Sequence, residues 1–536
     1  MKINIFSSLE SLDEKKVLSY LILITCIIGL IAQIYSYYNE LIFCPNFGDP
    51  ASRLDSSRRF YDSITPGIWN QIGTVWLPAH MILLLPFTKI SILWQTGIAG
   101  SIVGFISYLI SSILIFKIVF RITKEKFSAF LGWAIYTLNP NILYLQTTAM
   151  SEVVFFMFII ITFYFLQVLA DEGERMDVVK ASFFMMGAVA TRYEGWVIMS
   201  FLSLLIFYVY FKKKHKPLLY ALTFVSTSVA FILFWLYHNW KRYGDPLEFQ
   251  RGKYSLFRHA NAFLEANLLP QKGNLFLSTD LYTKAVLINT GLFIIIIFLI
   301  GLILYIYNNR LNIRTIFPYA LLILYPFSIY SLYEGQNVIL LPNTEPPGFV
   351  HSRYGLSLLP AIAIFGGCGY KYLKDMEFFR KLKYGKKILV YSFLFLIFIQ
   401  IISWTANYPQ NIASLAELDY GSKQMYYKIK GVSEFLRENY DGGNILLDEV
   451  IIRLLPSCAV PYRERIFPST WEIGEKALKE PSKYVRWIII DTEATKEKRN
   501  ILHYDEVYDK IKNNSDFLNN FKKVYIKEGV EVYKKI

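Results

Sequence analysis

Cysteine and charged residues are scarce in this sequence, which has four cysteines among 536 residues and a charged fraction of 18%. Four cysteines are too few for a disulfide-stapled scaffold of this length. Intrinsic disorder is also excluded, because it requires low hydrophobicity, whereas 54% of these residues are apolar and the mean hydropathy is +0.34. Soluble globular domains carry about 25% charged residues, and here the apolar residues form long uncharged blocks. The composition indicates a polytopic α-helical membrane protein.

Nine uncharged blocks approach the roughly 20 residues that a helix needs to cross the hydrocarbon core. They lie at 17–38, 97–116, 127–147, 153–170, 217–238, 285–307, 315–333, 355–370 and 388–407. A further apolar stretch, 181–211, is interrupted by Arg192 and Glu194, and we expect it to cross out and back with its turn at Thr191–Glu194. The segment Val75–Thr88 is short and contains two prolines, so we expect it to be re-entrant or interfacial. These assignments predict about eleven transmembrane helices.

The net charge of +14 is concentrated in short loops between the apolar blocks. The positive-inside rule explains such loops, so the charge requires no nucleic-acid partner. With eleven crossings, all the basic clusters fall on one side, including the largest at Lys371–Lys387. We therefore expect a multi-pass protein of the cell (plasma) membrane, in contact with the lipid bilayer, with a cytoplasmic N-terminus and an extracytoplasmic C-terminus.

The composition changes at about residue 408 and suggests two domains. Residues 1–407 form the predicted transmembrane domain, with a first external loop at 39–75. Residues 408–536 are charged and contain short β-rich runs at Asn444–Leu447, Trp487–Asp491 and Val524–Tyr533, with helical stretches at 471–480 and 504–519. We expect this C-terminal region to be a small extracytoplasmic α/β domain.

The first external loop mixes acidic and basic residues close to the membrane surface. One interpretation is an amphipathic surface helix over 51–62, stabilised by pairs such as Asp55–Arg59. Asp49 lies ahead of that helix, between Gly48 and Pro50. It is expected to be either a helix N-cap or a functional carboxylate.

Five motifs follow one another in regions expected on the outer side of the membrane. They are GDPASRLDSSRRF at 48–60, continuing to WLPAH at 76–80, then NPNILYLQTTAMSE at 139–152, ATRYEGW at 190–196, YGDPLEF at 243–249 and HSRYGLSLLP at 351–360. In this order they resemble the polyprenyl-phosphate-sugar-dependent membrane glycosyltransferases. This family has the C-type glycosyltransferase fold and includes the protein O-mannosyltransferases and the lipid A aminoarabinose transferase.

The resemblance implies an enzyme whose first external loop is catalytic and whose donor is a sugar on polyprenyl or dolichyl phosphate. Asp49 matches the acid that activates the acceptor, and Glu152 matches a second acid on the next external turn. An acceptor hydroxyl needs a general base, and displacement assisted by one base inverts the anomeric configuration. The implied reaction transfers a hexose, such as mannose, to a protein, lipid or glycan acceptor on the outer face.

The phosphate leaving group needs cations or hydrogen-bond donors at the same depth. Arg353, followed by Tyr354, is the first candidate for binding it, and Arg192 is the second. Each has an alternative role. Arg353 and Tyr354 could be interfacial anchors, and Arg192 could form an ion pair with Glu194.

His80, Arg53 and Glu194 complete the candidate substrate-binding residues, although His80 could instead hydrogen-bond a carbonyl within its apolar segment. No His/Cys cluster has the spacing of metal ligands, and no cofactor is expected. The related oligosaccharyltransferases use a divalent cation. The single Asp49 and the absence of a Trp-Trp-Asp motif argue against that subtype, but the sequence leaves metal dependence open.

Two other functions also fit a polytopic protein of this kind. A transporter or flippase for a lipid-linked sugar would more often show repeats and buried ionisable groups at mid-membrane, whereas the polar residues here gather at one face. A polysaccharide polymerase or ligase also uses lipid-linked sugars, but it usually works from a large late loop, and the distinctive residues here lie in the first loop.

Overall fold

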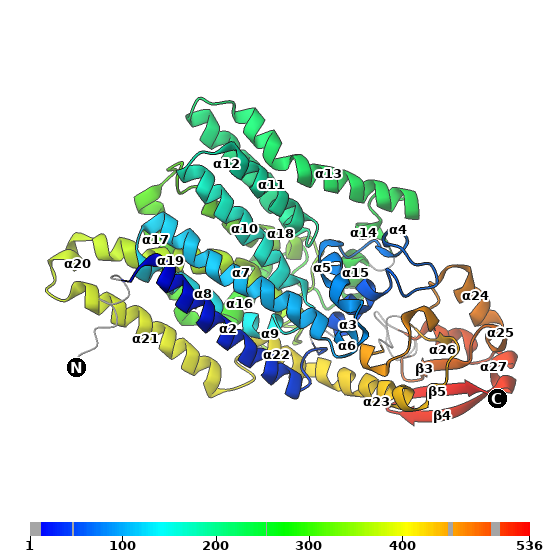
Figure 1. Cartoon of the computed structure of the whole chain (residues 1–536). Coiled ribbons are helices and arrows are strands. Elements are labelled where there is room, and N and C mark those ends of the chain that lie inside the picture. The colour runs from blue at the N-terminus through cyan, green and yellow to red at the C-terminus, as the bar shows by residue number, and fades with distance from the viewer. Residues whose placement is uncertain (1–11, 45–47, 253–254, 449–453, 495–503) are drawn as a thin grey trace.

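The computed structural model describes residues 12–44, 48–252, 255–448, 454–494 and 504–536. Among these residues, eight helical segments are long and apolar enough to cross a membrane. Figure 1 shows them in an elongated bundle, with the C-terminal strands at one end. The eight are α2 (Glu14–Tyr38), α7 (Ile98–Thr123), α10 (Ser151–Asp171), α12 (Glu194–Lys212), α13 (Pro217–Tyr243), α17 (Leu292–Asn309), η3–α19 (Ser352–Leu358 and Leu359–Asp375) and α21 (Gly385–Ala406). The protein is therefore a multi-pass membrane protein.

Three of the predicted crossings are made of shorter helices. Block 127–147 contains α8 (Lys126–Thr137) and α9 (Pro140–Leu145), which are separated at Asn139, whose side chain caps α9. Block 315–333 contains the 3-10 turn η2 (Phe317–Ile323) followed by α18 (Leu324–Tyr333). The third is α11 (Arg175–Val189). Since these elements fall short of a full span by length, the count of eleven stays a prediction.

The interrupted stretch 181–211 folds as two helices, as the sequence predicted. Helix α11 ends at Val189 and α12 begins at Glu194, so the turn contains Thr191 and Arg192. The short segment before α7 also forms only a ten-residue helix, α5 (Ala79–Thr88), which is too short to cross the hydrocarbon core.

The predicted crossing at 285–307 is present as α17, but it starts seven residues later than predicted because the helix is broken at Gly291. Residues 285–290 belong to α16 (Leu275–Thr290), and α17 starts at Leu292. Gly291 has a φ of +83°, and a Cβ there would lie 2.1 Å from the Gln400 side chain. Only glycine accepts both the backbone angle and this close approach.

Short elements connect the long helices. They are α3 (Asp49–Arg58), α4 (Ile68–Gln71), α6 (Ser91–Gln95), α14 (Glu248–Arg251), α15 (Leu256–Glu265), α20 (Glu377–Lys381), α22 (Ala413–Glu417) and the π turn η4 (Leu418–Ser422). Of these, α3 and α22 matter most for the site described below, because they bring acidic side chains to the end of the bundle nearest the C-terminal sheet.

The C-terminal region is built on a five-stranded mixed sheet in the order β2-β1-β3-β5-β4. Strands β1 and β2, and β1 and β3, pair in parallel, whereas β3–β5 and β4–β5 are antiparallel. The strands are β1 (Ile445–Leu446), β2 (Arg465–Ile466), β3 (Trp487–Asp491), β4 (Phe521–Lys527) and β5 (Val530–Lys535). The helices and 3-10 turns are α23 (Lys423–Asn439), η5 (Pro456–Cys458), η6 (Tyr462–Glu464), α24 (Trp471–Lys479), α25 (Pro481–Tyr484), α26 (Glu506–Ile511) and α27 (Ser515–Asn520).

The β-rich run Val524–Tyr533 is confirmed as parts of two strands, since Glu528 and Gly529 have positive φ and turn the chain between β4 and β5. The predicted helix 504–519 is split into α26 and α27. Its break coincides with Asn514, whose side chain caps α27. Residues 449–453 and 495–503 of this region, and 45–47 of the loop expected at 39–75, lie outside the described residues.

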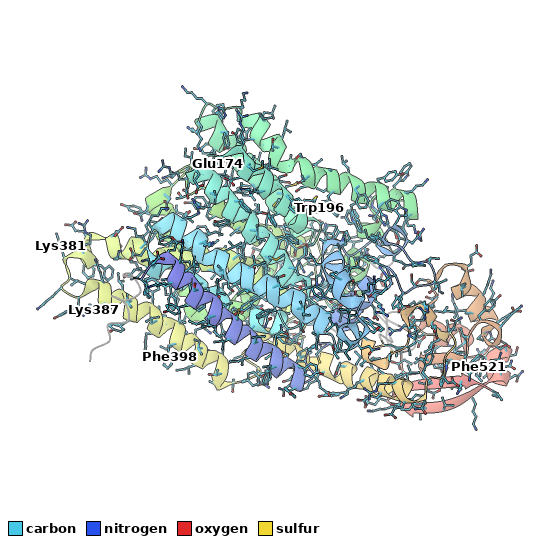
Figure 2. All side chains as sticks on the ribbon, viewed as in Figure 1. Glu174, Trp196, Lys381, Lys387, Phe398 and Phe521 are labelled. Atoms are coloured by element: carbon cyan, nitrogen blue, oxygen red, sulfur yellow. The ribbon has the colours of Figure 1, made fainter. Side chains whose placement is uncertain are left out.

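The C-terminal sheet shares a hydrophobic core with α3 and α6. Side chains alternate across β3: Trp487 and Ile489 join a core that includes Leu54 of α3 and Trp94 of α6, whereas Ile488 packs against the opposite layer of helices. The C-terminal region is thus packed on the loop that carries Asp49. Figure 2 shows the basic loop at Lys381 and Lys387 at the opposite end of the bundle from Phe521.

Candidate active site

Asp49 is the first residue of α3 and not its N-cap. The N-cap is Gly48, whose φ of +93° is in the left-handed region, where glycine is favoured. Pro50 follows at the start of the helix, where its missing N–H is not needed. Asp49 is 8% exposed. The capping role considered for Asp49 is therefore wrong, and its carboxylate is directed into a buried cluster of charges.

Arg353 lies at the centre of this cluster. Its Nε donates a hydrogen bond to Glu152 Oε1 at 2.9 Å, and its Nη2 lies 3.4 Å from Asp49 Oδ2. The side chains of Arg353 and Glu152 are 7% and 4% exposed. An interfacial anchor would keep its guanidinium in water or headgroups, so this burial does not fit the anchoring role considered for Arg353. The three motifs at 48–60, 139–152 and 351–360 thus meet at one point.

Arg192 joins the cluster from the turn between α11 and α12. It forms the predicted ion pair with Glu194, at 2.6 Å, and also donates to Glu152 Oε1 at 2.9 Å. Tyr354 lies between the two arginines, with its ring centroid 5.5 Å from the Arg192 guanidinium carbon and 5.4 Å from that of Arg353. Cation–π contacts of this kind hold the planar groups in fixed orientations.

Arg53 and His80 line the neighbouring part of the cluster. Arg53 is one turn after Asp49 on α3, is 8% exposed, and lies 4.4 Å over the ring of Trp76. His80 on α5 is 1% exposed and has Arg53 and Glu152 as electrostatic neighbours. Its Nδ1 makes no hydrogen bond among the described residues, so the carbonyl bond considered for His80 is not seen at that nitrogen.

Glu417 is a member of the cluster that the sequence did not predict. It ends α22, is 5% exposed, and accepts hydrogen bonds from the backbone N–H groups of His351 at 3.1 Å and Ser352 at 3.0 Å. Its Oε1 lies 3.9 Å from Nη1 of Arg353. Burial raises the pKa of the Glu417 carboxyl, and Arg353 opposes this shift. The available signal was a lone acid in the apolar run Ile412–Leu418.

Asp55 does not form the predicted pair with Arg59. It instead accepts hydrogen bonds from Arg465 of β2 at 2.9 Å and from Trp94 Nε1 at 3.0 Å. The Arg59 Nε donates to the carbonyl of Gln71. The idea of a surface helix is also wrong, because Leu54 is fully buried and α3 packs against the C-terminal region.

Several polar atoms of the cluster are buried with no hydrogen-bond partner among the described residues. They are Arg53 Nε, Arg353 Nη1 and Glu152 Oε2. Unsatisfied buried donors are costly and rare in native proteins. These two guanidinium groups can donate hydrogen bonds to the oxygens of a phosphate, while the carboxylate can accept a proton.

Among the described residues, no group of three or more His, Cys, Asp or Glu side chains could hold a metal ion.

Comparison with known proteins yields matches at the level of structure. No family model and no curated protein matches the sequence. The chain is similar to the crystal structure of ArnT from Cupriavidus metallidurans bound to undecaprenyl phosphate, with a TM-score of 0.58 and 10% identity over 98% of this chain and 99% of that one. It is also similar to the apo oligosaccharyltransferase of Archaeoglobus fulgidus, with a TM-score of 0.50 and 12% identity over 98% and 75% of the two chains. The C-type glycosyltransferase fold predicted from the motifs is confirmed.

Proposed function

We propose that this protein is an integral-membrane glycosyltransferase that moves a sugar from a polyprenyl-phosphate donor to an acceptor. The main support is the contact between Asp49 and Arg353, whose Oδ2 and Nη2 atoms are 3.4 Å apart in a buried cluster. A base beside a phosphate-binding cation is what this transfer requires. The fold shared with ArnT, which was crystallised with undecaprenyl phosphate, supports the same class of donor.

Asp49 is the proposed general base. Its carboxylate lies on the first external loop, at the end of the bundle where a lipid-linked sugar and an outer-face acceptor would meet. It takes the proton of the acceptor hydroxyl as that oxygen attacks the anomeric carbon. The polyprenyl phosphate then leaves, and the configuration is inverted because a single displacement occurs. A hexose such as mannose is the sugar class that the resemblance suggests.

Arg353 and Arg53 are the proposed ligands of the donor phosphate. Each has a buried N–H without a hydrogen-bond partner among the described residues. Phosphate oxygens would satisfy these donors and receive the negative charge that develops on the leaving group. The planar guanidinium suits two phosphate oxygens at once.

Glu152 is proposed to orient the arginines and not to act as a second base. One of its oxygens, Oε1, accepts hydrogen bonds from both Arg192 and Arg353 at 2.9 Å. A carboxylate shared in this way fixes the relative position of two guanidinium groups. Tyr354 contributes through its cation–π contacts with Arg192 and Arg353, and Glu194 through its ion pair with Arg192.

The proposal is tested with purified protein, a set of radiolabelled polyprenyl-phosphate sugars and a native membrane extract. We expect one donor to lose its label to the acceptor fraction with the wild-type protein, and label from the same donor to stay in the lipid fraction with Asp49→Asn. If no donor loses label, or if both proteins transfer it equally, the proposed reaction is wrong.

A further inference from the structure

The C-terminal region contacts the proposed active site at two separate points. One is the ion pair between Arg465 of β2 and Asp55 of α3. Their side chains are 2% and 14% exposed, and the Arg465 Nη1 lies 2.9 Å from Asp55 Oδ2. Trp94 Nε1 donates to the other oxygen of Asp55. An ion pair so far removed from water strongly constrains the position of both partners, because separation leaves each charge buried and unpaired.

Helix α3 transmits this constraint to Asp49. The helix is continuous from Asp49 to Arg58, so Asp55 and Asp49 are separated by about 9 Å along its axis at 1.5 Å per residue. The helix is also held by Ser57, whose hydroxyl donates to the carbonyl of Met81 in α5. A shift of α3 at Asp55 therefore moves the Asp49 carboxylate.

The second contact is Glu417, which constrains the backbone before Arg353. It accepts hydrogen bonds from the N–H groups of His351 and Ser352 and from the Ser352 hydroxyl at 2.6 Å. His351 has a φ of +54°, which is unfavourable for a residue with a Cβ and needs support from its surroundings. Glu417 immediately precedes η4 and α23, which lead into the C-terminal sheet.

We infer that Asp55, Arg465 and Glu417 are positioning residues, through which the C-terminal region sets the distance between Asp49 and Arg353. Asp55 and Arg465 position the base through α3, and Glu417 positions the phosphate-binding arginine through the 351–352 backbone. The kinetic consequences rest on the proposed function. The anchoring of α3 does not, because it is a property of the fold.

The two anchors predict different kinetic effects. Asp55→Asn should lower kcat by about 10–100-fold and change donor affinity by less than about threefold, because a misplaced base costs rate and not ground-state binding. Glu417→Gln should instead weaken donor binding, because it frees the loop that carries Arg353. If these residues had a purely structural role, Asp55→Asn and Glu417→Gln would change kcat and donor affinity in the same way. That result would overturn the inference.

A double variant tests whether Asp55 acts through Asp49. If it does, Asp49→Asn/Asp55→Asn should turn over as slowly as Asp49→Asn alone, because the base that Asp55 positions is already absent. Losses that multiply would overturn the inference. If Asp55→Asn protein does not accumulate, Arg465→Lys replaces it in the test, since lysine keeps the charge but loses the planar fork. Arg465→Lys must then slow turnover in the otherwise wild-type protein and cause no further loss in Asp49→Asn.

Hydrogen exchange provides a readout that needs no substrate. In Asp55→Asn, the backbone amides of α3 should exchange faster than in the wild-type protein. The matched control is Glu40→Gln, which breaks a more exposed ion pair between Lys430 of α23 and Glu40, two residues after the end of α2, and should leave α3 unchanged. Unchanged exchange of α3 in Asp55→Asn would disprove the anchoring. If the α3 amides exchange faster in Asp55→Asn but the wild-type protein transfers no sugar, the anchoring of α3 by Asp55 is supported and only the proposed reaction is wrong.

Discussion

Charged side chains at the two ends of the helical bundle differ in their exposure to water. In α20, the paired side chains of Lys381 and Glu377 are 76% and 80% exposed. At the other end, the paired side chains of Arg353 and Glu152 are 7% and 4% exposed. Water solvates the first pair and contributes most of its stability, whereas the second pair has lost its hydration and depends on its partners.

This difference separates charges that water solvates from charges that are held in a buried cluster. Exposed ion pairs contribute little to stability, and buried ones are often no better than apolar residues of similar size. Stability therefore does not explain why Asp49, Glu152, Arg192 and Arg353 are gathered in one buried place. The proposed reaction, which needs a base next to phosphate-binding cations, would account for it. The following variants test this comparison, from the largest expected effect to the smallest.

Replacement of the proposed base should have the largest effect. Asp49→Asn keeps the shape of the side chain and removes its ability to take a proton, so turnover should fall by about 10²–10⁴-fold. Donor binding and membrane insertion should stay near wild type, because a group that acts in the transition state adds little to ground-state binding. Steady-state kinetics and a donor-binding assay measure the two effects, with Glu40→Gln as the control. Full activity in Asp49→Asn would mean that the buried charges at this end of the bundle are no more important for transfer than the exposed charges at the other end.

Replacement of Arg353 should mainly affect donor binding. Arg353→Ala removes charge-assisted hydrogen bonds, each worth about 1.5–3 kcal/mol, so donor affinity should fall by about 10–100-fold. Arg353→Lys should retain part of that affinity, because it keeps the charge without the planar fork. Binding of a radiolabelled polyprenyl phosphate distinguishes the variants. Equal affinity in the wild type and both variants would mean that Arg353 does not contact the phosphate.

The helices, strands and site residues that were predicted from the sequence are those that short segments of the sequence indicate. Uncharged blocks located the long helices, and Trp487–Asp491 was predicted as a strand and is β3. The meeting of Asp49, Glu152 and Arg353 was also anticipated, because all three lie in motifs expected on one side of the membrane. Hydropathy could not reveal the break at Gly291, since the apolar run continues through it.

The contacts that the sequence did not predict join residues far apart in the chain. Asp55 and Arg465 are separated by 410 residues, and Ser352 and Glu417 by 65. A charge on a helix can pair locally, as predicted for Asp55 and Arg59, or across the fold. Local spacing cannot distinguish the two, because the choice depends on how the C-terminal region packs on the first loop.

A buried carboxylate in the C-terminal region, away from the candidate active site, tests whether loss of hydration changes the properties of a charged group in this protein. Asp505 is fully buried, and its oxygens accept hydrogen bonds from the N–H groups of Tyr508 and Asp491. Burial, reinforced by the carboxylates of Asp448 and Asp491, raises the pKa of Asp505 to about 7. The folded form therefore binds this proton more tightly than the unfolded form. The stability it contributes is complete below the unfolded pKa of about 4 and is lost as the pH rises through about 7.

This shift predicts a C-terminal region that is less stable at pH 8 than at pH 6, by about 1 kcal/mol from Asp505. Asp505→Asn should reduce that dependence while keeping a good N-cap for α26. The measurement is hydrogen exchange of β3 and β5 in the full-length protein, corrected for the intrinsic effect of pH on exchange. A pH dependence that is the same in both proteins would show that Asp505 does not titrate in this range.

The smallest effect is expected at the basic end of the bundle. Glu377→Gln removes the partner of Lys381, but both side chains are already largely in water, where the loss of one ion pair is compensated by hydration. Donor turnover should not change, and the midpoint of thermal unfolding should stay within about 2 °C of the wild type. Turnover and the unfolding midpoint of the purified protein check both expectations. If Glu377→Gln slowed turnover as much as a change in the Asp49 cluster, charges at the two ends would be coupled through the bundle, and burial would no longer identify the residues that act in transfer.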